Sequence, residues 1–167
     1  MAFIDVAADG TKSLTFYNVT FGVGAGGRNW EEDVKIVQFF LKRIYSLPKY
    51  QKMKPWGEMV VDGKSGPITR AWIAKFQADA TRNGIPMRID GKIDKAGNAH
   101  GNYVASFSGT YYAIRILNNM MYTQDQQVYK NLTTHPEVPA DVRAIFQQIH
   151  AQGPQMVYEN PLMALNQ

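Results

Sequence analysis

The segment DGKSGPITRAWIAKFQ, residues 62–77, combines a glycine-containing turn with the start of an amphipathic helix. Gly63 and Gly66 accept backbone conformations that other residues resist, and Pro67 has no amide hydrogen to lose in a first helical turn. After the proline, large apolar residues recur at four-residue intervals: Ile68, Trp72 and Phe76. The segment therefore predicts a corner that leads directly into a helix with one buried face, in which Trp72 is a core residue.

The order of residues in this segment follows the pattern D-G-x-x-G-P-x-T-x-x-A-x-x-x-F-Q. Its matching positions are Asp62, Gly63, Gly66, Pro67, Thr69, Ala71, Phe76 and Gln77. The pattern resembles the signature of the peptidoglycan-binding domain (type 1) family. Upstream, residues 33–41 resemble the first helix of that family, and Gly26-Gly27 followed by Asn29 resembles the lead-in of its injection-associated members. Downstream, Asp90-Gly91-Lys92-Ile93 resembles its second glycine corner.

The motif residues are expected to have mainly architectural roles. Gly63 and Gly66 form the corner, and Ala71 permits close packing of the helix. Phe76 fills the core, and Gln77 satisfies backbone groups of a loop. These residues are therefore not expected to contact a ligand.

The residues around the motif predict further elements. Residues 1–28 are rich in β-forming side chains and predict a short hairpin or edge segment, which the glycines of residues 22–27 end. Asn29 is expected to cap a first helix, with Glu32 completing a capping box, and Pro48 predicts its end near Ser46.

Three more helices follow from the same signals. Pro67 and Gly84 predict the limits of the second helix, near residues 67–83. Ser108 is expected to cap the third, with Ile114, Leu117 and Met121 on one face, and a fourth follows Pro139, with a face formed by Val142, Ile145, Phe146 and Ile149. The two units of corner plus helix resemble a degenerate internal repeat.

The expected fold is mainly α, with a three-helix peptidoglycan-binding-like core and glycine corners. We expect an N-terminal β-like arm at 1–28, the family-like domain at 29–122, and a C-terminal helical extension at 123–167. Relative to the family pattern, the domain carries insertions at 48–61 and 95–107. The apolar stripe of the extension is expected to pack on its own chain, and self-association or a protein partner is the alternative.

Composition limits the chemistry and the partners. The chain has 167 residues, a net charge of +4 and no cysteine, which excludes disulfides, thiol nucleophiles and cysteine-ligated zinc. The mild positive charge favours anionic partners such as wall polymers, membranes or nucleic acid, without choosing among them. No apolar run approaches the length of a membrane span, and the first residues lack a secretory signal. We therefore expect either that a leader has been removed, or that the protein is made in the cytoplasm and reaches the cell wall by lysis or through an injection machine.

Basic and aromatic residues alternate between positions 34 and 57. The basic residues are Lys35, Lys42, Arg43, Lys49, Lys52 and Lys54, and Tyr45, Tyr50 and Trp56 lie among them. Such a stretch could hold a polyanion or stack on sugars, or it could be a solvated face whose aromatic side chains enter the core. For a glycan, the candidate ligand-binding residues are Arg70, as a forked donor, and Trp56, Tyr50 and Tyr111, as stacking surfaces.

The sequence favours no catalytic or metal site. His100, His135 and His150 are scattered without the spacing of zinc ligands, so no metal or cofactor is expected. Glu58 with Asp62 is the one carboxylate pair to test for muramidase-like glycosidase activity. An aspartate before a glycine usually binds nearby backbone amides, which favours a structural role for Asp62.

The expected function is therefore non-catalytic binding of peptidoglycan by an adaptor or targeting subunit. The alternative is a structural or protein-docking subunit of a phage-like or secretion assembly that reuses the fold. A nucleic-acid partner is not expected, because the basic stretch has no recognised nucleic-acid-binding motif.

Overall fold

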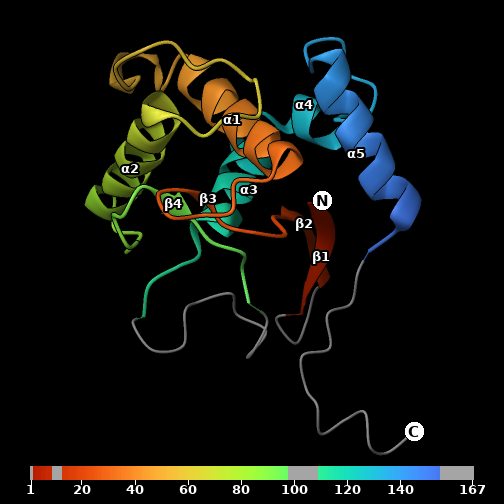
Figure 1. Ribbon diagram of the computed structural model, residues 1–167, viewed down its shortest axis with the longest axis horizontal. Helices are drawn as coiled ribbons and strands as arrows, with labels where there is room; N and C mark the ends of the chain where they lie inside the picture. Colours follow the sequence, from red (N-terminus) through yellow and green to blue (C-terminus); the bar gives the residue numbers. More distant parts are fainter. Residues whose placement is uncertain (1, 9–12, 98–108, 155–167) are drawn as a thin grey trace, which may run out of the picture.

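The computed structural model describes residues 2–8, 13–97 and 109–154, and this part of the chain is mainly helical, as the sequence predicts (Figure 1). Its strands are β1 (Phe3–Ala8), β2 (Ser13–Asn18), β3 (Val23–Gly24) and β4 (Lys92–Ile93). Its helices are α1 (Glu31–Ser46), the single 3₁₀ turn η1 (Gln51–Met53), α2 (Pro67–Arg82), α3 (Ala113–Gln124), α4 (Gln126–Lys130) and α5 (Ala140–Gln152).

The predicted N-terminal hairpin is present. β1 and β2 pair antiparallel, with Phe3 opposite Asn18 and Ala8 opposite Ser13. The very short strands β3 and β4 also pair antiparallel, with Val23 opposite Ile93. This second pair joins the loop that precedes α1 to the second glycine corner, although the two are far apart in the sequence.

The start of α1 differs from the prediction. The helix begins at Glu31, after Trp30, and no side chain caps it. Asn29 instead takes a left-handed conformation, with φ of 52°. Its side chain accepts from the Gly24 amide at 2.6 Å and donates to the Gly27 carbonyl at 2.8 Å. Asn29 therefore closes the preceding loop, which asparagine suits because it tolerates positive φ, and the expected capping box does not form.

The limits of α2 agree with the prediction, since it runs from Pro67 to Arg82 and Gly84 follows with φ of 87°. Trp72 and Phe76 are buried, as predicted. Ala71 lies on the exposed side of the helix, so the packing role expected for it is not fulfilled. The buried face instead includes Ile73, beside Trp72.

The C-terminal helices follow their predicted apolar faces. Ile114, Leu117 and Met121 of α3 are buried, and so are Val142, Ile145, Phe146 and Ile149 of α5. Ser108 lies outside the described residues, and α3 itself begins only at Ala113. The short helix α4 was not predicted. Residues 98–107 of the second expected insertion, with His100, also lie outside the described residues.

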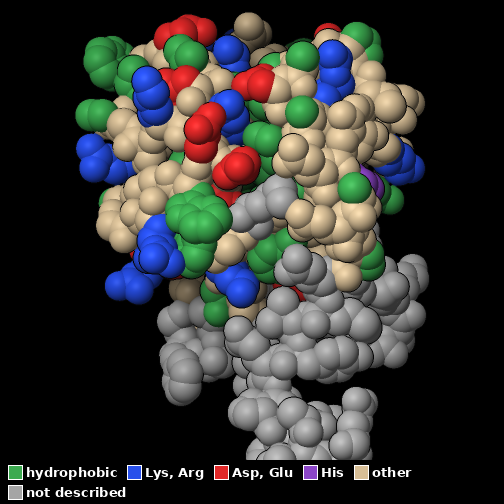
Figure 2. All heavy atoms as spheres, turned by 45° about the vertical axis from the view of Figure 1, so that its right-hand side comes forward, with side chains coloured by type: hydrophobic (Ala, Val, Ile, Leu, Met, Phe, Trp, Pro, Cys, Tyr) green, Lys and Arg blue, Asp and Glu red, His purple; other side chains and the backbone are tan. Residues whose placement is uncertain are grey.

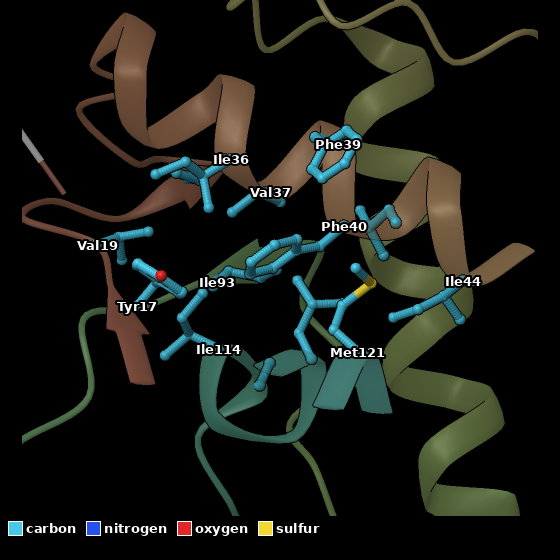
Figure 3. Close-up of a cluster of buried hydrophobic side chains, with 14 of the residues drawn as sticks. Tyr17, Val19, Ile36, Val37, Phe39, Phe40, Ile44, Ile93, Ile114 and Met121 are labelled. Atoms are coloured by element: carbon cyan, nitrogen blue, oxygen red, sulfur yellow. The ribbon is translucent and has the colours of Figure 1, made fainter. Parts of the chain in front are cut away.

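Phe40 of α1 lies at the centre of the hydrophobic core, where it is fully buried (Figure 3). Its ring centroid lies 6.4 Å from that of Tyr17 on β2, 6.0 Å from that of Tyr129 on α4 and 6.0 Å from that of Phe146 on α5. Figure 3 shows Tyr17, Ile93, Ile114 and Met121 converging on the same cluster. The hairpin and the C-terminal helices are thus built on the same core as α1.

We predict that Phe40→Ala lowers the free energy of unfolding by about 3–5 kcal/mol, because it removes a buried ring and leaves a cavity where three elements meet. Urea denaturation followed by circular dichroism measures this change. Ile89→Ala is the control, because the Ile89 side chain is 54% exposed, and its effect is expected to stay within about 0.5 kcal/mol. A loss below about 1 kcal/mol for Phe40→Ala would show that the three elements are not coupled through this ring.

Candidate binding site

The first glycine corner is held by the buried side chain of Gln38 on α1. Its Oε1 accepts from the amides of Asp62 and Gly63, at 3.1 and 2.9 Å. Its Nε2 donates to the Lys64 carbonyl at 3.1 Å and to the Thr69 hydroxyl at 3.1 Å. Asp62 Oδ1 accepts from the same Nε2 at 3.0 Å and from the Lys64 amide at 2.9 Å. One carboxamide therefore satisfies both donors and acceptors of the turn.

The second corner repeats this arrangement with Gln77 on α2. Gln77 Oε1 accepts from the amides of Asp90 and Gly91, at 3.1 and 2.9 Å. Its Nε2 donates to Asp90 Oδ1 at 3.1 Å and to the Lys92 carbonyl at 2.8 Å. The Lys92 amide donates to Asp90 Oδ1 at 3.0 Å. Gly63 and Gly91 have φ of 77° and 70°, which explains why both corners read Asp-Gly-Lys.

The structure thus contains the internal repeat that the sequence predicts, and it adds the residue that holds each corner. The role expected of Gln77 is confirmed, whereas the sequence analysis assigned no role to Gln38. The role of Gln38 could have been inferred from the sequence, because Gln38, like Gln77, is a helical glutamine followed in the chain by an Asp-Gly-Lys segment. Gly66 has an ordinary φ of −95° and nothing near the position of an added Cβ, so its corner does not require glycine there.

The four candidate ligand-binding residues do not share a cavity. The Trp56 side chain is 86% exposed, and Arg70 is exposed in the first turn of α2. Tyr50 is half-buried beside the Lys49 ammonium, which lies 5.3 Å from its ring centroid. Tyr111 is 39% exposed and precedes α3. These residues do not gather into one pocket.

The basic stretch does not form one continuous surface. Lys35 pairs with Glu31 at 2.9 Å and with Asp141 at 3.2 Å. Arg43 pairs with Asp125 at 2.7 Å and with Glu137 of the loop before α5 at 3.3 Å. On the face seen in Figure 2, blue basic side chains are interspersed with red acidic ones. Part of the stretch therefore fixes the C-terminal helices to α1 instead of facing a ligand.

The carboxylates considered for catalysis have other partners. Glu58 is exposed and lies 3.6 Å from the Lys54 ammonium. Hydrogen bonds from the Lys64 amide and the Gln38 carboxamide lower the pKa of the Asp62 carboxyl below its ordinary value, which does not suit a general acid. The described residues contain no group of three or more histidines and carboxylates placed to hold a metal ion.

A cavity of about 840 Å³ lies among the hairpin, α3, α4 and α5, whose positions can be followed in Figure 1. Much of its wall is aromatic, and its described basic and amide groups come mainly from the helices. The aromatic residues of the wall are Phe16, Tyr17, Tyr111, Tyr122 and Tyr129, and the basic and amide residues are Arg115, Asn118, Asn119, Lys130 and His150. Of the four predicted ligand-binding residues, this cavity contains only Tyr111.

Asn118 organises the wall of this cavity. Its Oδ1 accepts from the Tyr17 amide at 2.9 Å and from the Tyr129 hydroxyl at 2.7 Å, and its Nδ2 donates to the Tyr17 carbonyl at 2.9 Å. The Tyr17 hydroxyl lies 2.7 Å from His150 Nε2. Burial raises the pKa of Tyr17 to about 12, so its phenol stays protonated at neutral pH. The rings of Tyr17 and Tyr129 are therefore fixed by hydrogen bonds and not only by packing.

A second cavity, of about 410 Å³, lies beside η1 and includes Tyr50 in its wall. Asp79, also in the wall, accepts from the Tyr45 hydroxyl at 2.9 Å and from the Lys75 ammonium at 2.6 Å. Burial, and then the Asp79 carboxylate, raises the pKa of Tyr45. The Asp79 carboxylate already accepts hydrogen bonds from Tyr45 and Lys75. It is therefore less available to bind a ligand in this cavity.

Comparison with protein-family models, with curated proteins and with solved structures found no match to this chain. Among the described residues, no helix has the length and apolar character needed to cross a membrane.

We predict that Gln38→Glu destabilises the fold by about 2–4 kcal/mol at neutral pH. The substitution removes the amide donor that contacts Asp62, the Lys64 carbonyl and Thr69, and it places a carboxylate beside Asp62 and the Lys64 carbonyl. In the variant, the two carboxylates repel, so the folded state binds protons more readily than the unfolded state. Relative to the wild type, its stability should therefore rise as pH falls from about 7 to about 4.

Urea denaturation across this pH range measures the effect. Gln51→Glu is the matched control, because Gln51 is exposed on η1, and it should change stability little at any pH. Equal stability of the Gln38→Glu variant and the wild type at neutral pH would contradict the role assigned to the carboxamide.

Proposed function

We propose that this chain is a non-catalytic binding module for peptidoglycan, and that it acts as an adaptor or targeting subunit. The observation that carries the proposal is the pair of equivalent corners, in which Gln38 and Gln77 each hold an Asp-Gly-Lys turn. These are the segments on which the resemblance to the peptidoglycan-binding domain (type 1) family depends. The duplicated geometry supports that resemblance, because it gives the matched residues a common structural purpose.

The position of Trp56 supports a binding role on the same domain. Its carbonyl accepts from the indole Nε1 of buried Trp72 at 3.1 Å, so the backbone that carries Trp56 is tied to the core. Its own side chain is nevertheless 86% exposed. An exposed tryptophan ring on a fixed backbone suits stacking on the apolar face of a sugar. Because the backbone is already ordered, binding costs little conformational entropy. Arg70, exposed on α2, would supply a donor for wall carboxylates or acetamide carbonyls.

The environment of the carboxylates favours binding over hydrolysis. Asp62 is engaged in the corner, and Glu58 is exposed with its side chain 72% accessible. A glycosidase acid usually lies in a buried, apolar environment, whereas both of these carboxylates are exposed. A binding module that holds a partner enzyme or particle at the wall raises the local concentration of that partner near its substrate. An adaptor needs no catalytic activity of its own to do this.

We predict that the protein co-sediments with purified peptidoglycan sacculi at low and moderate salt without releasing soluble muropeptides. Persistence in salt is expected because stacking is not screened as exposed charge pairs are. Trp56→Ala and Arg70→Ala should each weaken binding at least about fivefold, which corresponds to about 1 kcal/mol. Sedimentation across a range of sacculus concentrations gives the apparent dissociation constants.

Matched controls are available on the same chain. Trp30→Ala removes another exposed tryptophan, which precedes α1, and Arg88→Ala removes another exposed arginine. Both should bind as the wild type does. Absence of sedimentation, together with self-association in ultracentrifugation, would favour the structural or docking subunit, and release of muropeptides would favour an enzyme.

A further inference from the structure

We infer that the larger cavity binds an acidic sugar of peptidoglycan, a muramic acid unit with its lactyl carboxylate, rather than a neutral sugar. This inference rests on the proposed function and assigns a ligand class to a site separate from Trp56 and Arg70. Its described walls come from the N-terminal hairpin, α3, α4 and the C-terminal end of α5, and they include neither Trp56 nor Arg70.

The size and walls of the cavity suit a saccharide. A volume of about 840 Å³ lies within the range of small-molecule sites, which is roughly 300–1,000 Å³. Tyr122 is 46% exposed, and its ring packs edge-to-face on Tyr129, with centroids 6.0 Å apart. Tyr129 is in turn hydrogen-bonded to Asn118. The exposed ring is thus supported from behind, as a stacking platform for a pyranose requires.

The charge of the wall selects an anion. The described residues of the wall include Arg115, Lys130 and His150 but no aspartate or glutamate. The Lys130 ammonium lies over the Tyr122 ring, 5.8 Å from its centroid, so a cation covers part of one face of the platform. A sugar stacked on Tyr122 would bring a carboxylate on its rim within reach of Lys130. A neutral sugar would gain the stacking without the charge pairing.

The geometry of the deeper wall limits which residues select the ligand. Asn118 donates to the Tyr17 and Ile114 carbonyls and accepts from Tyr17 and Tyr129, so its carboxamide is already satisfied. It therefore positions the rings and does not select the ligand. Lys130 and Tyr122, which are both exposed, are the residues that select the ligand.

The test compares two disaccharides that differ by the lactyl group. N-acetylglucosaminyl-N-acetylmuramic acid carries the carboxylate, and N,N′-diacetylchitobiose is its neutral counterpart. Isothermal titration of the full chain should show that the acidic disaccharide binds at least about fivefold more tightly. Lys130→Gln should abolish this preference while leaving the binding of chitobiose unchanged, and Tyr122→Ala should weaken both. Lys52→Gln, an exposed lysine of η1, is the matched control and should alter neither.

Equal affinity for the two disaccharides, no binding of either, or insensitivity to both cavity variants would overturn this inference. Sacculus sedimentation of the same protein samples separates its failure from that of the proposed function. If sacculi bind but neither disaccharide does, only the cavity assignment is wrong. If neither sacculi nor disaccharides bind, both proposals are wrong.

Discussion

Two buried glutamine carboxamides fix the frame of this molecule. A glycine corner exposes backbone amides and carbonyls that point toward the adjacent helix, where water is excluded, and unpaired groups there would each cost about 1–3 kcal/mol. Gln38 and Gln77 satisfy them with both ends of one planar group. Because each glutamine lies within a helix, the turn that it holds is fixed to that helix. The direction in which the chain leaves each corner, and therefore the placing of α2 and β4, depends on these contacts.

The remaining elements assemble on the opposite side of α1. Phe40 brings β2, α4 and α5 around one ring, and the ion pairs of Lys35 and Arg43 fasten the segments around α5 to the same helix. α1 therefore serves two assemblies, the corners on one side and the hairpin with the C-terminal helices on the other. The larger cavity lies within the second assembly, so its shape depends on segments that the family resemblance does not reach.

Periodicity and helix-end signals predicted most of the helical architecture. The faces of α3 and α5, the limits of α2 and the end of α1 all follow from local sequence, because burial periodicity, proline and glycine act within a few residues. Asn29 shows where this reasoning fails: the residue suits either a helix cap or a left-handed loop, and contacts with Gly24 and Gly27 decide between them. The ion pairs of Lys35 and Arg43 could not be predicted either, because most of their acidic partners lie far away in the sequence. The cavity could not be predicted for the same reason, because its walls meet only after the hairpin packs on α3.

The two corners also differ in one respect that bears on how such a chain can change. The glutamine and the aspartate that it binds are separated by 24 positions in the first corner and by 13 in the second, yet the hydrogen bonds between each glutamine and its Asp-Gly-Lys turn are the same. These hydrogen bonds therefore form with chain segments of different length between the glutamine and the turn. The entropic cost of closing a longer loop also grows only slowly with its length. The first loop is a natural position for variation in length and composition. Descendants of this chain, or engineered versions of it, could exchange the segment that carries Trp56 for another recognition surface without altering the helices that present it.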